Sequence, residues 1–454
     1  MNALLPWILI TLVLASAFPW SIWFLAAGSQ TVEAALAIPL TLALSTGVLS
    51  LVMFWQALAG IPLDLGRITL VYFVVMLPGV WLGWRRGFSW PRIQLPRTRL
   101  EYLALALLVM ISAGVLFTSL YWPFSRADSI GIYAHYGEYM YSQRTLADLP
   151  GSLTIHEAYP ILVPLLYTYA YLAAGWPQEF LARLFPAMMS IAILSIIYAF
   201  GRRLHSKAAG WIGALLLALT PTFGSWASSG YVDLPMAFFY LLAVVFAWRL
   251  WESGRWQDAA LCGAMAGLAA WTKNAGLVGI GLLVIWLLWV RLKQQTSWPL
   301  IGLALAVCAG IAAPWYVRNW LGAGLIIPPT IWSDQASQTV GTLLVLATHP
   351  ETYALSGPLI LLSIFAALID VIRRRLDTPA LLLLLWWTLP FYAVWWWFAS
   401  YDPRFVLLFL PVLCVLAGVQ IARLWNHVPG QWQQRLVLPI AIVMLILGLR
   451  ATWD

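Results

Sequence analysis

The residues best suited to chemistry gather in one short polar stretch, FSRADSIGIYAHYGEYMYSQR, at positions 124–144. Only 9% of the 454 residues are charged, yet this stretch contains two arginines together with Asp128, His135 and Glu138. A carboxylate in such a place can remove a proton from a hydroxyl group, and neighbouring cations can hold an anion. The stretch is therefore the first candidate for a functional site.

Further polar residues interrupt apolar sequence at four later points. They are Asp233 in SSGYVDLP, Lys273 in WTKNAG, Arg318 in PWYVRNW and Arg404 in SYDPRF. Carboxylates combined with several cations suit a substrate that has an anionic head and an apolar tail, such as a lipid-linked phosphate. Cations would neutralise the phosphate as it leaves, and a carboxylate would take the proton of the incoming hydroxyl. The residues thus predict transfer of a sugar from a polyprenyl-phosphate donor.

The elements that position these residues are membrane-spanning helices. Hydrophobic residues make up 62% of the chain, and runs such as 4–28 and 380–398 are continuously apolar rather than alternating. The sequence predicts an all-α polytopic membrane protein with about fourteen spans. Cys262, Cys308 and Cys414 all fall in apolar segments, which indicates packing rather than a disulfide framework or a zinc site.

Orientation follows from the short basic clusters between the apolar runs. If clusters such as 85–99, 202–207 and 373–375 face the cytoplasm, the predicted spans alternate consistently along the chain. That scheme requires the apolar run 159–175 to be a juxtamembrane or re-entrant helix, within a large outer loop at 122–180. Lys273, Arg318 and Arg404 then lie on the outer side, against the positive-inside trend, which favours a functional role for them.

Charge and motifs also exclude some classes of function. The net charge is +8, but the basic residues occur in short clusters between apolar runs, as expected for residues that orient a membrane protein. We therefore expect no nucleic-acid partner. The sequence has no Walker A motif, which argues against an ATP-driven pump. Two alternatives stay open: a flippase or other transporter of lipid-linked saccharides, and a ligase or polymerase that uses a diphosphate-linked oligosaccharide.

The chain resembles the GT-C superfamily of membrane glycosyltransferases, the type that includes protein O-mannosyltransferases and the lipid A aminoarabinose transferase. The resemblance covers about 120 to 420. It is carried by these segments in order: ADSIGIY (127–133), HEAYPILVPLLY (156–167), ARLFPAMMSIAILSIIYAFGRRL (182–204), YVDLPMAFFYLLAVVFAW (231–248), GLAAWTKNAGL (267–277), APWYVRNWLGAG (313–324) and DPRFVLLFLPVLCVLAG (402–418).

The resemblance implies a GT-C-type transmembrane helical bundle with juxtamembrane helices in the first outer loop, and a transfer that usually inverts the sugar. It implies Asp128 as general base, with Tyr133 supporting the motif. Asp233 is the second catalytic candidate, and Asp233, Glu157 and His156 form a tentative ligand set for a divalent metal, with Mg, Mn and Zn all open. Substrate phosphate would be held by Lys273, Arg318, Arg404 and Tyr133.

Two departures from the family pattern are visible. Relatives commonly have Asp-Glu at the first motif, whereas this chain has Asp128-Ser129, so the role of the second acid is absent or has moved, for example to Glu138. The chain also has extra spans before this loop. We therefore expect N-terminal helices and a basic cytoplasmic linker at 1–100, a catalytic module at 101–330 and C-terminal transmembrane helices at 331–454.

Plainer explanations exist for two of the acids. Asp128 after Ser-Arg-Ala, and Asp233 before Pro235, both stand where Asp commonly caps a helix N-terminus. The overall expectation is a multi-pass protein of the inner (plasma) membrane with its site facing the periplasm or outside. Its partners would be a polyprenyl-phosphate sugar donor (hexosyl or pentosyl), a lipid, glycan or protein acceptor, and membrane lipids.

Overall fold

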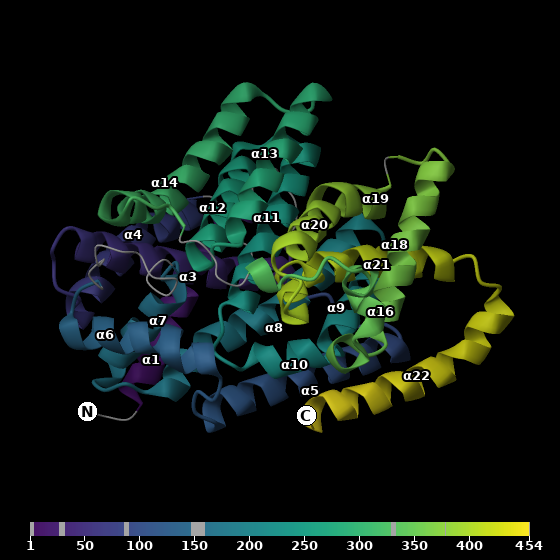
Figure 1. Cartoon of the computed structure of the whole chain (residues 1–454), viewed down its shortest axis with the longest axis horizontal. Coiled ribbons are helices and arrows are strands. Elements are labelled where there is room, and N and C mark those ends of the chain that lie inside the picture. The colour runs from purple at the N-terminus through teal and green to yellow at the C-terminus, as the bar shows by residue number, and fades with distance from the viewer. Residues whose placement is uncertain are drawn as a thin grey trace. The chain divides into compact units, whose positions relative to one another are not determined.

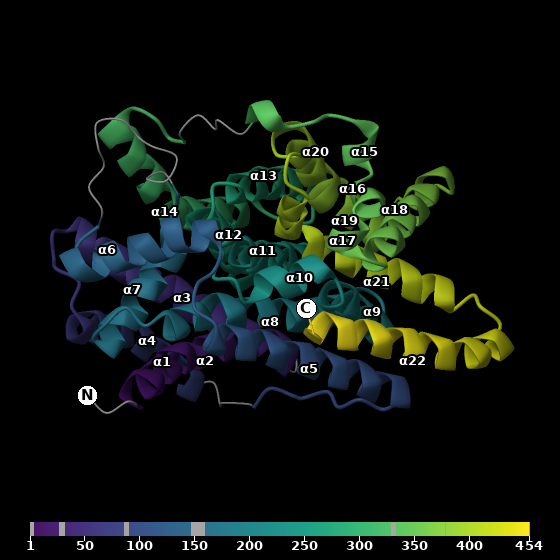
Figure 2. The same cartoon turned by 60° about the horizontal axis from the view of Figure 1, so that its bottom comes forward.

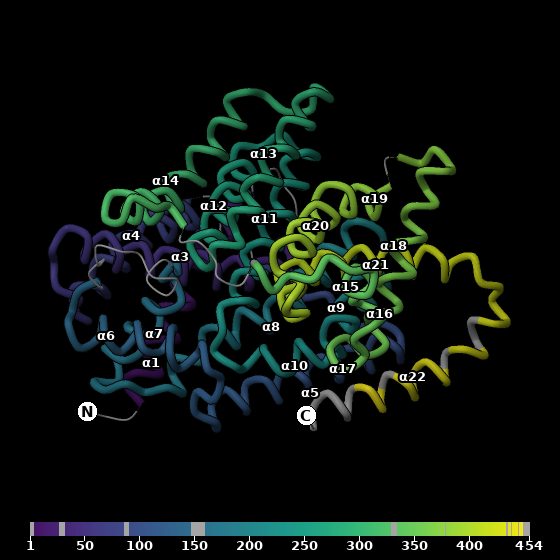
Figure 3. The backbone as a smooth tube through the Cα atoms, viewed as in Figure 1, coloured from purple at the N-terminus to yellow at the C-terminus, as the bar shows by residue number. Residues whose placement is uncertain are grey.

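The fold is helical throughout the part of the chain that the computed structural model describes, residues 4–26, 32–85, 90–146, 159–327, 333–376 and 378–453 (Figure 1). Within these ranges β-pairing is limited to one isolated bridge, between Glu33 and Arg92. The prediction of an all-α protein is thereby confirmed. The coloured backbone trace in Figure 3 follows the same segments.

Eight helices among the described residues are long and apolar enough to cross a membrane, or nine if one bent pair counts as a single span. The bent pair is α9 (Lys207–Ala218) with α10 (Pro221–Ala227), which meet at 69°. Five further apolar helices have 10–17 residues. The expected fourteen spans therefore include segments too short to cross a bilayer perpendicularly, since a helix needs about 20 residues to do so.

The described chain divides into two compact units that interleave along the sequence. Unit 1 is 1–93, 118–190 and 228–330, and unit 2 is 94–117, 191–227 and 331–454. Each is described separately below. The division of roles at residues 100 and 330 stays a prediction.

Unit 1 contains the candidate site. Its helices are α1 (Leu5–Ser16), α2 (Phe18–Leu25), α3 (Ala34–Leu58), α4 (Leu65–Arg85), the π-helix η1 (Ser129–Ala134), α6 (His135–Gln143), α7 (Leu162–Ala174), the first part of α8 (Glu179–Leu204), α11 (Asp233–Ser253), α12 (Trp256–Thr272), α13 (Gly276–Leu292) and α14 (Trp298–Ala323). Figure 1 shows α11, α12 and α13 beside one another, in agreement with their mutual contacts.

Helix α11 is the buried centre of unit 1, since 94% of its most apolar window is inside the protein. Small residues let its neighbour α12 pack closely on a third helix, α14. A Cβ added to Gly263 would lie 2.0 Å from the carbonyl oxygen of Ala304, and one added to Gly267 would lie 2.8 Å from that of Cys308. Glycine is therefore required at these points for the backbones to approach each other.

The apolar run that the topology scheme assigned to the outer loop forms α7. Its 13 residues give a helix about 20 Å long, which is too short for a hydrocarbon core of about 30 Å. Twelve of the 13 side chains are buried, and α7 packs along α6 (Figure 2). Thr168 on α7 donates a hydrogen bond to the carbonyl oxygen of Gly137 on α6, at 3.1 Å. A short helix held inside the protein agrees with the juxtamembrane assignment.

Unit 2 comprises most of α5 (Arg99–Tyr121), the rest of α8, the pair α9 and α10, and the C-terminal helices. The latter are η2 (Ser333–Gln335), α15 (Val340–Leu343), α16 (Val345–Thr348), α17 (Pro350–Tyr353), α18 (Ser356–Ile372), α19 (Pro379–Leu383), η3 (Leu384–Thr388), α20 (Leu389–Phe398), η4 (Pro403–Leu408), α21 (Leu410–Trp425) and α22 (Gly430–Trp453). Its core is the packing of α21 on α9, where Gly418 lies against the Ala209 carbonyl.

The close α12–α14 contact gives a direct test of this packing. We expect Gly263→Ala to lower the stability of the protein by about 1–3 kcal/mol, because the new methyl group would push two helix backbones apart. Thermal unfolding in detergent micelles measures the change. Gly302→Ala on α14 is the matched control, since a Cβ there meets nothing within 4 Å. Equal unfolding temperatures for the two variants would contradict the packing described.

Candidate active site

Asp128 stands at the N-terminal boundary of the π-helix η1, which folds the first half of the polar stretch. π-Helical turns are rare and often lie at functional sites. The Asp128 carboxylate makes no capping hydrogen bond and is half-buried. Among the described residues it also has no ion pair. The simple capping explanation therefore does not account for this aspartate.

Tyr231 connects Asp128 to the second acidic segment of the site. The backbone N–H of Asp128 donates a hydrogen bond to the Tyr231 hydroxyl at 3.1 Å. The Tyr231 ring also packs edge-on against the ring of Tyr133 in η1, with 5.9 Å between their centroids. Because Tyr231 is only two residues before Asp233, the structure brings Asp128, Tyr133 and Asp233 into one region of unit 1.

Two charged residues near the start of α8 hold the chain just before Asp128. Arg183 is only 2% exposed and donates hydrogen bonds to the carbonyl oxygens of Pro123, at 3.0 Å, and Ser228, at 3.1 Å from its Nε. Glu179, one turn earlier, accepts a 2.6 Å hydrogen bond from the N–H of Phe124. The same short stretch of α8 thus fixes both the segment leading to Asp128 and the segment leading to Asp233.

The turn between these segments depends on Gly230. Its φ of +79° lies in the left-handed region that glycine adopts easily, and a Cβ there would lie 2.3 Å from the Phe124 ring. Tyr167 of α7 donates a 2.7 Å hydrogen bond to the Gly230 carbonyl. Burial raises the pKa of the Tyr167 hydroxyl well above its ordinary value, so the group stays protonated and can donate. Helix α7 therefore supports the turn from one side.

The first contact between predicted site residues is the ion pair of Lys273 with Asp233. Asp233 begins α11 and Lys273 directly follows α12, and their side chains are 1% and 12% exposed. The Lys273 ammonium nitrogen contacts Oδ1 of Asp233. Each charge also lies at the helix end whose dipole stabilises it, the acid at an N-terminus and the base at a C-terminus. The ion pair therefore joins the start of α11 to the end of α12.

Arg318 lies near the end of α14, on a helix turn that reaches the same region. Two residues before it, the Tyr316 hydroxyl donates to the carbonyl oxygen of Ala270 at 2.9 Å and lies 3.3 Å from Oδ1 of Asn274. Asn274 is the neighbour of Lys273 in the sequence. The Arg318 guanidinium lies over the Trp315 ring, 5.0 Å from its centroid. The last turns of α14 therefore place Arg318 at the end of the bundle that carries Lys273.

Arg404 belongs to unit 2, as do the three residues that surround it, Trp226, Asp402 and Phe405. Its guanidinium lies 4.4 Å from the centroid of the Trp226 ring and 4.7 Å from that of Phe405, and it pairs with Asp402 at 3.2 Å. The Tyr353 hydroxyl donates to the carbonyl oxygen of Pro403, which fixes the start of η4. Arg404 is therefore held in one orientation between aromatic rings rather than extended as a long surface side chain.

The residues expected to bind a metal fall largely outside the described structure. Glu157 and His156 lie in 147–158, which is not among the described residues. Asp233, the third candidate, forms the ion pair with Lys273. In the described residues no group of three or more His, Cys, Asp and Glu side chains is arranged to hold a metal ion. Of the three predicted metal ligands, the described residues therefore include Asp233 alone.

Sequence reasoning missed the residues that hold the site together. These are Tyr231, Arg183 and Glu179, with Gly230 and Tyr167 behind them. One signal was available, since Glu179 and Arg183 are two opposite charges four residues apart at the start of a long apolar run, where charge is costly without a partner. For Tyr231 no sequence pattern distinguishes it from the other tyrosines.

Comparison with solved structures identifies the class of fold. ArnT from Cupriavidus metallidurans bound to undecaprenyl phosphate is similar with a TM-score of 0.55 and 20% identity, over 76% of this chain and 64% of that one. The Archaeoglobus fulgidus oligosaccharyltransferase in its apo form gives 0.53 and 13%, over 78% and 55%. The AglB oligosaccharyltransferase from the same organism, in complex with an inhibitory peptide and a dolichol-phosphate, gives 0.52 and 14%, over 78% and 56%.

These likenesses define the chain as a polytopic membrane protein with the GT-C fold, as the sequence resemblance predicted. Residues 159–317 match the model of the family described as dolichyl-phosphate-mannose-protein mannosyltransferase. No curated protein sequence matches the chain. The chain spans less than two thirds of the length of each of these solved structures.

The link between Asp128 and Tyr231 generates a structural prediction. Tyr231→Phe keeps the ring against Tyr133 and removes the hydroxyl that accepts the Asp128 N–H. Loss of one hydrogen bond of about 0.5–1.5 kcal/mol should raise amide exchange there by up to about tenfold. Hydrogen exchange of the peptide covering 124–134, followed by mass spectrometry, measures this.

The control for this experiment is Tyr141→Phe, which removes a hydroxyl that donates to the carbonyl oxygen of Gly175 at the end of α7. It should leave exchange in 124–134 unchanged. If Tyr231→Phe also left it unchanged, the hydrogen bond would not be holding Asp128.

Proposed function

We propose that the protein is a glycosyltransferase that moves a sugar from a polyprenyl-phosphate donor to an acceptor hydroxyl at the outer face of the membrane. One observation carries the proposal. Asp128 has no ion pair among the described residues, and its backbone N–H is bonded to the Tyr231 hydroxyl. Tyr231 lies two residues before Asp233, which forms a buried ion pair with Lys273. A proton acceptor and phosphate-binding cations are what this reaction requires.

In the proposed reaction Asp128 accepts the proton of the acceptor hydroxyl as its oxygen attacks the anomeric carbon of the sugar. The bond between that carbon and the phosphate oxygen breaks, and the polyprenyl phosphate leaves with the bonding electrons. A single displacement of this kind inverts the configuration at the anomeric carbon. Lys273 and Arg318 of unit 1 would stabilise the negative charge on the departing phosphate. Phosphate binding by Arg404 stays a prediction from the sequence.

The solved relatives support the kinds of substrate in this proposal. One carries undecaprenyl phosphate, and another carries a dolichol-phosphate and an inhibitory peptide. By analogy we propose a lipid-phosphate donor for this chain, with a lipid, glycan or protein as acceptor. We also keep the proposals that residues 101–330 form the catalytic module, that Tyr133 contributes to the substrate site, and that the site faces the periplasm of an inner membrane.

The role of a divalent metal belongs to the same proposal. Asp233, with Glu157 and His156 from the predicted outer loop, would supply its oxygen and nitrogen ligands. Carboxylates suit Mg or Mn, and the histidine broadens the choice to Zn. The metal would act by neutralising phosphate charge.

The experiment that tests the function incubates purified protein in detergent or nanodiscs with radiolabelled polyprenyl-phosphate sugars, each with and without chelator. Transfer or hydrolysis of the sugar supports a glycosyltransferase, and loss of the reaction on chelation would indicate the metal. Movement of intact donor across a liposome membrane without chemical change would instead support a transporter of lipid-linked saccharides.

Substitution of the proposed base gives the sharpest prediction. Asp128→Asn should lower kcat for transfer at least about 100-fold, because the amide cannot accept the proton, while the affinity for donor stays the same. Glu351→Gln is the matched control. Glu351 is exposed and lies on α17 in unit 2, so its loss of charge should leave transfer near the unchanged rate. Full activity in Asp128→Asn would remove Asp128 from the mechanism.

The phosphate contact of Arg318 gives a second prediction. Arg318→Gln should weaken donor binding by about 10- to 100-fold, the effect of losing one charge-assisted hydrogen bond of about 1.5–3 kcal/mol, and should leave acceptor KM unchanged. Lys293→Gln, which removes one positive charge from the exposed residue that follows α13, is the control. Equal effects on donor and acceptor would show that Arg318 does not recognise the phosphate.

A further inference from the structure

We propose that a buried ionic cluster at the closed end of the α11–α12 hairpin positions Lys273 against Asp233. The cluster consists of Arg249, Ser253, Arg255 and Asp258, and below it is called the closed-end cluster. Its role is to fix the register between the two helices whose opposite ends carry the site pair. The inference rests on the proposed function for its importance, although the positioning itself can be tested without any substrate.

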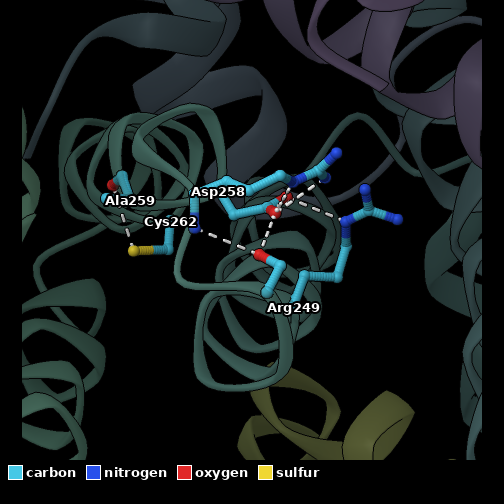
Figure 4. Close-up of polar contacts among 6 residues, drawn as sticks. Arg249, Asp258, Ala259 and Cys262 are labelled. Atoms are coloured by element: carbon cyan, nitrogen blue, oxygen red, sulfur yellow. Dashed lines mark hydrogen bonds and ion pairs between the residues drawn. The ribbon is translucent and has the colours of Figure 1, made fainter. Parts of the chain in front are cut away.

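The closed-end cluster is centred on the carboxylate of Asp258, which is 1% exposed (Figure 4). Arg249 donates from Nε to Oδ1 at 2.9 Å, and Arg255 donates from Nε and Nη2 to Oδ2 at 2.9 and 2.8 Å. The Ser253 hydroxyl also donates to Oδ2, at 2.7 Å. Three side chains from α11 and the turn are thereby tied to one acid in the first turn of α12.

The two ionic contacts of the hairpin are separated by nearly the same length of helix on each side. Asp233 and Arg249 are 16 positions apart on α11 (249 − 233), and Asp258 and Lys273 are 15 apart across α12 (273 − 258). At 1.5 Å per residue these distances are about 24 and 23 Å. An antiparallel pair with one contact formed at its closed end is therefore in register for the other contact at its open end.

The charges are also arranged so that only this register satisfies them. Helix α11 has its acid at the open end and its base at the closed end, while α12 has the reverse. The residues between, 234–248 and 259–272, carry no charge. A slip of one helical turn, about 5.4 Å, would separate both pairs at once and leave buried charges without partners.

The residues of α11 and α12 between the two ionic contacts are uncharged, so these contacts are the charged interactions that distinguish one register from another. Buried ionic groups are best attested as devices that select one register among several. An ordinary orienting arginine at a helix end would instead extend to the membrane surface, whereas Arg249 is only 8% exposed.

The experiment compares Asp258→Asn with a matched variant in unit 2. Asp370→Asn also removes one buried carboxylate charge, because Asp370 is 3% exposed and pairs with Arg423 at 2.7 Å. Three quantities are measured on each full-length protein: thermal stability, the rate at which an amine-acylating reagent modifies Lys273 without substrate, and kcat and donor KM for transfer.

Both variants should lose stability, but only Asp258→Asn should change the site. We expect Lys273 to be acylated several-fold faster in that variant, because its pair with Asp233 opens more often, and kcat to fall about tenfold or more through misplacement. Asp370→Asn should leave both site measurements unchanged. Arg249→Lys keeps the charge and provides a milder variant if Asp258→Asn does not fold, with a smaller increase in Lys273 acylation.

The outcomes separate the inference from the proposed function. Unchanged Lys273 acylation in Asp258→Asn and Arg249→Lys, or the same increase in Asp370→Asn, would overturn the positioning role. Faster acylation confined to the closed-end variants supports it. If this occurs in a protein that transfers no sugar, the proposed function fails while the positioning role stands.

Discussion

The buried ion pair between Asp233 and Lys273 is the constraint on which the rest of the candidate site depends. Two opposite charges taken out of water are stable only when they stay together, so the ends of α11 and α12 cannot separate without exposing a buried acid. The segments next to these helix ends are therefore held in fixed positions. Tyr231 and Gly230 precede Asp233, and Asn274 follows Lys273, so the pair anchors the turn on one side and the α14 contact on the other.

The loop that carries Asp128 is held by its backbone more than by its side chains. The carbonyl of Pro123 and the N–H groups of Phe124 and Asp128 are each bonded to a side chain from another element. A backbone held at three points within six residues leaves the Asp128 side chain oriented while its carboxylate stays available. This arrangement agrees with the general rule that functional side chains stand on loops supported by a rigid scaffold.

Sequence alone could predict the helical class, the GT-C resemblance and the short α7, because hydropathy and charge between spans report directly on the membrane. It could also select Asp233 and Lys273 as unusual residues. It could not predict that they pair, since their contact requires the α11–α12 register, nor that Tyr231 receives the Asp128 N–H, since that contact joins residues 103 positions apart. The expected spans also include short helices such as α21, whose 16 residues are fewer than the about 20 that a perpendicular crossing needs.

Asp128 differs from the buried aspartates of the described chain in whether a cation is paired with it. Asp233, Asp258 and Asp370 are each paired with a cation, which satisfies their charge inside the protein. Among the described residues, Asp128 has no such cation, although Lys273 and Arg318 belong to the same unit. In the proposed reaction the carboxylate that takes the proton has to be distinct from the carboxylate that holds a cation. Asp128 and Asp233 meet that requirement, because Asp233 is the one that pairs with Lys273.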